Sequence, residues 1–308
     1  MTSPIRGNRI IMFLLPYLII TGTIASSLIG MGILDPIAGI IVHQIISFGI
    51  PFVIYMLVTK HKISDVIPIK PLGIKNIIYI AAIIAVATPM VGFVSLLSSL
   101  FVENPVPQVM DNVAEFHLWM IILAIGVAPS IFEEIMFRGV IYHEYKNIPI
   151  RKAAFVNGIF FGIMHLNFHQ FIYAFALGVL FCYFLYYTKS ILAPIIAHFF
   201  INGPQVIINY FIPGVLADTP QYYEEIPPME MFMVIIFLGA IAVALLPLII
   251  FLIRSFAQHN KDKVGVVPLP NIEEEGAHSE ENREGVITWE FWACVVFFIM
   301  VASTFIFI

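Results

Sequence analysis

Nine runs of mainly apolar residues constrain the fold of this chain more than any other feature. A helix that crosses a bilayer needs about 20 such residues. The runs cover residues 9–33, 37–59, 76–102, 118–145, 151–166, 169–188, 190–212, 229–256 and 288–308. Charged residues make up only 11% of the chain, against about 25% in soluble domains. We therefore predict an all-α, polytopic transmembrane bundle of about eight or nine spanning helices, with ends placed to within several residues and a short fifth run that is either tilted or does not cross fully.

Basic residues lie on one side of this scheme. If the N-terminus is cytoplasmic, the intracellular flanks hold Arg6, Arg9, Lys60, Lys62, Lys70, Lys75, Lys146, Arg151, Lys152, Lys189, Arg254, Lys261, Lys263 and Arg283. The charged residues of the opposite loops are all acidic, for example Asp111 and Glu224. Positive charge marks cytoplasmic loops. We therefore expect a cell-membrane protein with a retained first helix, a cytoplasmic N-terminus and, with nine helices, an external C-terminus.

The runs divide into three regions. Residues 1–117 carry the first three helices, residues 118–212 carry helices four to seven, and residues 213–308 carry the last two. Within the last region, residues 257–287 are polar and acidic, which predicts a cytoplasmic linker. The net charge of −5 points to no nucleic-acid partner, so the expected partners are the lipid bilayer and a substrate in it.

The fourth run contains three charged residues, Glu133, Glu134 and Arg138. Each costs about 2.5–3.5 kcal/mol near the bilayer centre, so we expect a compensating structure or a use. Glu134 and Arg138 are four residues apart on one helix face, which predicts an ion pair. Glu133 is rotated by about 100° from Glu134 and has no local partner. It is either a neutral, hydrogen-bonded carboxyl group or a functional one.

Two later runs carry further polar residues. His165 lies near the end of the fifth run, and His198 and Asn202 lie four residues apart in the seventh. Each alone is as consistent with packing or interhelical hydrogen bonds as with catalysis. Gly158 and Gly162 form a small-residue face that predicts a close approach by another helix. From the helical rise, all three polar residues and Glu133 lie within the membrane, so they can face one cavity.

Three short motifs in this order resemble one known family. They are Glu133-Glu134-x-x-x-Arg138, Phe161-x-x-x-His165 and His198-x-x-x-Asn202. Together they resemble the signature of the CPBP family, also called the Abi family, which includes the CAAX prenyl proteases and bacteriocin-processing-like membrane proteins. The resemblance covers roughly residues 118–212 and implies an intramembrane glutamic endopeptidase that acts on a peptide or protein at the membrane.

The resemblance also implies a role for each motif residue. Glu133 and His165 would activate a water, His198 and Asn202 would form the oxyanion hole, and Glu134 and Arg138 would support the helix geometry. No cofactor is implied. A buried glutamate that takes a proton from water and returns it to the leaving amine is reasonable general acid–base chemistry, and N–H donors aimed at an oxyanion lower the barrier.

Three other functions remain open from the residues alone. Glu133, His165 and His198 are residue types that bind zinc, so a divalent-metal protease is one alternative. Intramembrane ionisable residues also mark ion pathways, which makes a membrane transporter another. The third is a catalytically silent immunity or scaffold protein. Metal content, solute flux and function after Glu133→Gln distinguish the three.

Overall fold

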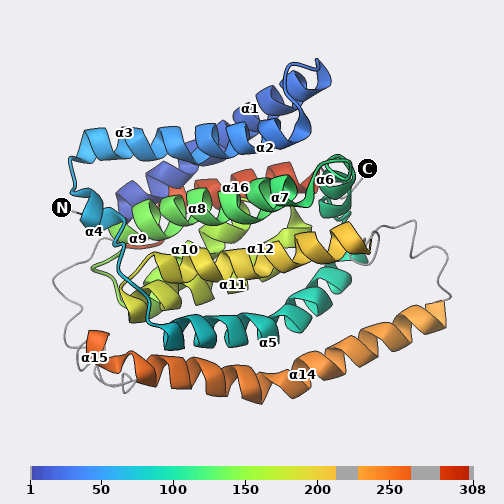
Figure 1. Ribbon diagram of the computed structural model, residues 1–308. Helices are drawn as coiled ribbons and strands as arrows, with labels where there is room; N and C mark the ends of the chain where they lie inside the picture. The colour runs from blue at the N-terminus through green and yellow to red at the C-terminus, as the bar shows by residue number, and fades with distance from the viewer. Residues whose placement is uncertain (1, 213–227, 265–284, 305–308) are drawn as a thin grey trace.

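The computed structural model describes residues 2–212, 228–264 and 285–304, and this part of the chain is helical without strands (Figure 1). The elements are α1 (Pro4–Gly30), α2 (Pro36–Gln44), η1 (Ile45–Gly49), α3 (Ile50–Thr59), α4 (Ile63–Val66), α5 (Ile74–Ser99), α6 (Val106–Asp111), α7 (Leu118–Ile121), η2 (Ile122–Val127), α8 (Ala128–Glu134), η3 (Ile135–Ile141), α9 (Tyr142–Glu144), α10 (Ile150–Ile163), α11 (Phe168–Thr188), α12 (Leu192–Phe211), α14 (Pro228–His259), α15 (Lys261–Val264) and α16 (Trp289–Ser303). Elements α2 to α3, and α7 to α9, each form one continuous span.

The chain is a multi-pass membrane protein, as predicted from its apolar runs. Among the described residues, seven helices are long and apolar enough to cross a bilayer. The other two predicted runs form helices as well, but α10 has 14 residues and α16 has 15. The sequence correctly predicted that α10 would be short. The helix ends at Ile163, three residues before the predicted end at 166, which is within the several residues to which the ends of the runs were predicted.

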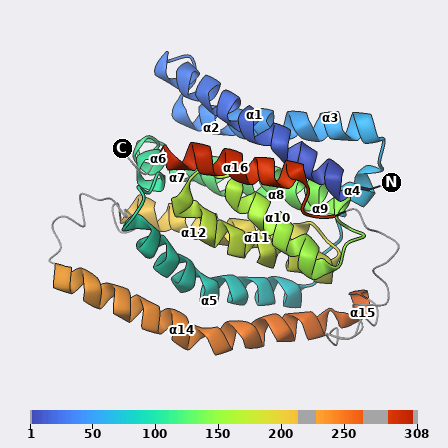
Figure 2. The same ribbon diagram turned by 180° about the vertical axis from the view of Figure 1, so that it is seen from behind.

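The basic connections lie together at one end of the bundle. The N-terminus, α4, α9 and α15 occupy that end, whereas α6 and the end of α16 occupy the other (Figures 1 and 2). This separation agrees with the charge pattern, while the side that faces the cytoplasm stays a prediction. Most of the predicted acidic linker, 265–284, and of an external loop, 213–227, lies outside the described residues.

The helices form layers around a central group. Helices α1 to α3 lie on one side, α8 to α12 form the centre, and α5 separates α11 and α12 from the outermost helix, α14 (Figure 1). Within the centre, α10 and α11 approach closely. A Cβ atom on Gly178 would lie 2.9 Å from the Cα atom of Gly158. The predicted small-residue face is therefore confirmed.

Three π-helical segments interrupt two spans that contact each other: η1 lies in the span from α2 to α3, and η2 and η3 lie in the span from α7 to α9. In each segment, a side chain from another helix donates to a backbone carbonyl: Tyr17 to Ile46 (3.1 Å), Asn202 to Ile125 (3.3 Å) and Asn157 to Phe137 (2.8 Å). Segments of this kind are frequent at functional sites. Each of these hydrogen bonds joins a π-helical segment to a neighbouring helix.

A buried carboxylate fixes the basic end of the central span. Glu144, the last residue of α9, accepts hydrogen bonds from the backbone N–H of Ser3 (2.7 Å), Arg6 Nη1 (3.2 Å) and the Tyr55 hydroxyl (2.6 Å). These donors satisfy a charge that would be costly to bury unpaired. The network therefore connects α1 and α3 to the span that also carries Glu133 and Glu134.

Candidate active site

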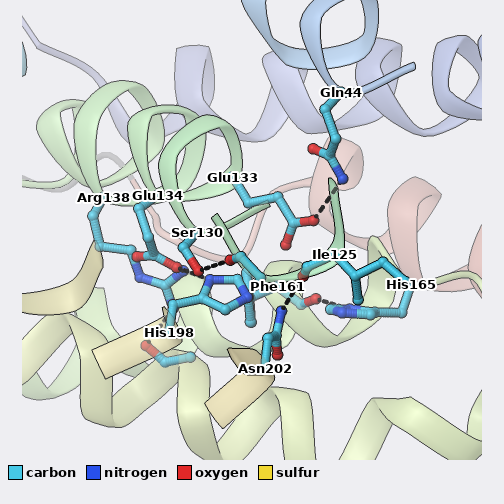
Figure 3. Close-up of polar contacts among 12 residues, drawn as sticks. Gln44, Ile125, Ser130, Glu133, Glu134, Arg138, Phe161, His165, His198 and Asn202 are labelled. Carbon is cyan, nitrogen blue, oxygen red and sulfur yellow. Dashed lines mark hydrogen bonds and ion pairs between the residues drawn. The ribbon is translucent and has the colours of Figure 1, made fainter. Parts of the chain in front are cut away.

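The neighbouring glutamates Glu133 and Glu134 point to different surroundings, as the helical rotation predicted (Figure 3). Glu134 Oε1 accepts from Arg138 Nη1 at 3.0 Å, and this ion pair is completely buried. Arg138 Nη2 also donates to the carbonyl of Gly178 at 2.9 Å. The predicted Glu134–Arg138 pair is therefore confirmed, and it holds α8 and η3 against α11.

Two phenylalanine rings pack against the Arg138 guanidinium. Its central carbon lies 4.3 Å from the ring centroid of Phe161 and 5.2 Å from that of Phe181. A cation over an aromatic face is attracted by the ring quadrupole. The phenylalanine of the second sequence motif thus packs directly on the arginine of the first motif, which links α10 to η3.

Glu133 has a partner that the sequence did not indicate. Gln44, the last residue of α2, donates from Nε2 to Glu133 Oε1 at 3.2 Å, and both side chains are buried. The two residues come from different spans and are 89 positions apart. The only local signal was an amide in an otherwise apolar run, a position where polar residues pair across helices.

His165 lies just after α10, in the turn that leads to α11. Its Nδ1 is 2.8 Å from the carbonyl of Phe161. A carbonyl can only accept, so Nδ1 carries the proton and a neutral ring presents Nε2 as an acceptor. Asn167 donates to the His165 carbonyl at 2.7 Å and caps α11 by accepting from the N–H of Gln170 at 2.8 Å. The turn therefore holds the imidazole in one tautomer.

His198 and Asn202 share one face of α12, as their spacing predicted. His198 Nδ1 lies 2.9 Å from Glu134 Oε1, the same oxygen that binds Arg138. Asn202 uses one amide N–H to reach the Ile125 carbonyl. Its second N–H and the Nε2 of His198 have no hydrogen-bond partner among the described residues, so each can meet a ligand.

Phe161 joins the histidines of the second and third motifs. Its ring centroid lies 5.3 Å from that of His165 and 5.8 Å from that of His198. Figure 3 shows the side chains of Glu133, His198 and Asn202 around Phe161, with His165 on the other side of Phe161 from His198. Within the described chain, no hydrogen bond links Glu133, His165 and Asn202 directly. The motifs meet through a shared neighbour, Phe161, which contacts Arg138, His165 and His198.

The zinc alternative concerns how closely acidic, cysteine and histidine side chains gather. No three His, Cys, Asp or Glu side chains of the described residues gather closely enough to hold a metal ion. His198 directs Nδ1 to Glu134 and His165 directs Nδ1 to a carbonyl, so only their Nε2 atoms are open. The metal content of the purified protein tests the zinc alternative.

Comparison with known proteins finds similarity over the helices that carry the motifs. Residues 115–204 match the family model described as type II CAAX prenyl endopeptidase Rce1-like. A protein of Bacillus subtilis (strain 168) described as "Putative membrane peptidase YdiL" is 34% identical over 124 residues, which is 40% of this chain and 48% of that protein. The match thus spans about half the length of that relative. No solved structure matches the chain.

Proposed function

We propose that residues 115–204, which match the Rce1-like family model, form a CPBP-family domain, and that this multi-pass membrane protein is an intramembrane endopeptidase of the glutamic type. It would hydrolyse a peptide bond of a membrane-associated substrate. One observation carries the proposal. All three motifs converge around Phe161, and a buried glutamate stands beside them without a cationic hydrogen-bond partner among the described residues.

Glu133 and His165 would activate the attacking water. Glu133 Oε2 is free to accept the water proton because Gln44 occupies Oε1. His165 would accept a second hydrogen bond at Nε2, since its Nδ1 proton is held by the Phe161 carbonyl. The water oxygen attacks the peptide carbonyl carbon, and its proton passes to Glu133. Proton transfer of this kind contributes about 10²–10⁴-fold to a rate.

Asn202 and His198 would stabilise the oxyanion. Asn202 keeps one N–H for this purpose while the other holds the Ile125 carbonyl. His198 can donate from Nε2 only as the imidazolium, because Nδ1 faces the Glu134 carboxylate. A role as oxyanion donor therefore requires the imidazolium form of His198, which the Glu134 carboxylate contacts. Preorganised donors of this kind need no reorganisation when charge develops.

Collapse of the tetrahedral intermediate completes the reaction. The C–N bond breaks, and the proton held by Glu133 moves to the leaving amine. The products are a carboxylic acid and an amine, which together hold the oxygen and both hydrogens of the water, so atoms and charges balance. Glu134 and Arg138 would not touch the substrate. They would hold His198 and Phe161 in place, because both residues contact that pair.

We also propose that the N-terminus is cytoplasmic and the C-terminus external. The basic connections at one end of the bundle support this orientation. Lys62→Cys and Gln108→Cys, which lie in exposed connections, test it with a membrane-impermeant maleimide. Reaction at Gln108→Cys alone in intact cells is expected. Reaction at Lys62→Cys alone would reverse the orientation.

Cleavage by purified protein tests the activity. Wild type, Glu133→Gln, His165→Ala and His198→Ala are incubated in detergent with a fluorogenic prenylated CAAX peptide and with a mixed membrane-peptide pool. We expect cleavage by wild type and a loss of about 10²-fold or more in each variant. Full activity in the two histidine variants would contradict the assignment.

A further inference from the structure

Gln44 lies outside the segment that matches the family, yet it is the hydrogen-bond partner of the candidate catalytic glutamate. It extends from the end of α2 toward Glu133 (Figure 3). Both side chains are 8% exposed, so bulk water does not compete strongly for the bond. A buried amide is retained at such a position only if its polar atoms are used.

The orientation of the Gln44 amide follows from chemistry. The NH₂ group faces Glu133 Oε1, and this is the orientation that an ionised carboxylate requires, because it only accepts hydrogen bonds. The carbonyl oxygen, Oε1, then points elsewhere. It is buried and has no hydrogen-bond partner among the described residues. An unpartnered buried acceptor is unfavourable, and beside a catalytic carboxyl group it indicates that a ligand supplies the missing donor.

The backbone around Gln44 is held firmly. The π-helical segment η1 begins at the next residue. Tyr17 donates to the Ile46 carbonyl at 3.1 Å, and the hydroxyl groups of Thr21 and Ser47 lie 2.7 Å apart in the core. Two contacts from consecutive turns of α1 therefore fix the helix from which Gln44 projects, as a site that positions a reacting group requires.

We propose that Gln44 completes the active site. Through Nε2 it positions Glu133, and through Oε1 it accepts a backbone N–H of the bound substrate peptide. This inference rests on the proposed endopeptidase function. A peptide presented for cleavage carries N–H donors on both sides of the scissile carbonyl, so one of them can reach an acceptor beside the water-activating carboxyl group. The first two spans would then contribute directly to substrate binding.

Labelling of Glu133 tests the positioning role without any substrate. Purified wild type, Gln44→Met and Gln44→Asn are treated with a hydrophobic carbodiimide, and modification of Glu133 is followed by mass spectrometry. Methionine is close in size but cannot donate, and asparagine is one methylene too short. Loss of the bond should speed labelling about three- to tenfold, the equivalent of one ordinary hydrogen bond. The exposed Gln108→Met is the control and should match wild type. An unchanged rate in both Gln44 variants would overturn the positioning role.

A double-mutant cycle that combines a Gln44 variant with a modified substrate tests the acceptor role of Gln44 Oε1. A peptide that wild type cleaves in a Glu133-dependent manner is N-methylated at each amide flanking the scissile bond. Wild type should lose about tenfold or more in kcat/KM at one position, and Gln44→Met should show no further loss there. Additive losses would mean that Oε1 binds water rather than the substrate. If no peptide is cleaved in that manner, the endopeptidase proposal and the acceptor role both fail, while the labelling result still decides the contact with Glu133.

Discussion

The span from Leu118 to Glu144 and helix α14 are both apolar enough to cross a membrane, but they use their side chains differently. The most apolar window of α14 has a mean hydropathy of 3.1 and is only 6% buried within the protein, whereas that of the central span has a value of 1.9 and is 56% buried. The less apolar helix is therefore the more buried one, the reverse of the trend in water-soluble proteins.

Lipid as the surrounding solvent explains the reversal. Helix α14 shows most of its surface to hydrocarbon, so nearly every residue must be apolar. The central span shows its surface to other helices, where Glu134, Arg138 and Glu144 find partners. Polar residues in a spanning helix thus mark protein contacts or function. Matched substitutions in the two helices should have very different effects.

The largest difference should appear in catalysis. Asn202→Ala removes an oxyanion donor and should lower kcat by about 10²–10³-fold. Asn260→Ala, just after α14, removes a buried asparagine that packs on Asn76 and should leave kcat unchanged. Initial rates at saturating substrate measure both. Equal losses in the two variants would show that the effect of Asn202 is structural.

Substitution of an arginine should destabilise the protein far more in the central span than in α14. Arg138→Met leaves Glu134 charged and buried, which should cost about 3–5 kcal/mol in the free energy of unfolding. Arg254→Met in α14 removes an exposed side chain and should change that free energy by less than about 0.5 kcal/mol. Denaturant titration in micelles gives both values. A cost below about 1 kcal/mol for Arg138→Met would contradict the buried pair.

Glycine substitutions should give a smaller contrast. At Gly158, an added Cβ would lie 2.6 Å from Val179 Cγ2 and 2.9 Å from the Phe175 carbonyl oxygen, and this backbone cannot move aside easily. Gly158→Ala should therefore cost about 1–3 kcal/mol. At Gly239 in α14, the nearest atoms belong to the Phe93 ring at 3.1 Å, which can rotate. Gly239→Ala should be neutral or slightly stabilising in the same titration.

The smallest effect should come from the attachment of α14 itself. Asn260 Nδ2 donates to Asn76 Oδ1 at 2.7 Å. Asn260→Ala removes this bond and the bond from Nδ2 to the Phe256 carbonyl, and should lower the free energy of unfolding by about 1–2 kcal/mol. If the variant instead loses several kcal/mol, α14 supports the bundle more than its exposed surface indicates.

The sequence predicted the helices well because lipid requires long apolar runs. It also predicted the Glu134–Arg138 pair, which is local to one helix turn. It did not predict the three π-helical segments, since they leave the length and composition of a span unchanged. The exact end of α10 before His165 was not predicted either, because apolar residues continue past Ile163 while the backbone turns at Leu166, with φ at 55°.

The partners of the site residues needed the structure. Contacts of Glu133 with Gln44 and of Glu134 with His198 join different spans, 89 and 64 positions apart. Interhelical packing decides such contacts, and no spacing rule within one helix defines them. Asn167 did carry a readable signal, an asparagine directly before an apolar run, which is typical of a helix N-cap. Its second role, holding the His165 carbonyl, emerged only from the fold.

Cleavage with and without a metal chelator tests the central claim most directly. Wild type and Glu133→Gln are compared on the same membrane-peptide pool, with Glu230→Gln at the start of α14 as the matched control. The account predicts cleavage by wild type and Glu230→Gln that chelation does not change, and none by Glu133→Gln. Cleavage by Glu133→Gln at the wild-type rate, or cleavage that stops on chelation, would contradict a glutamate-activated water.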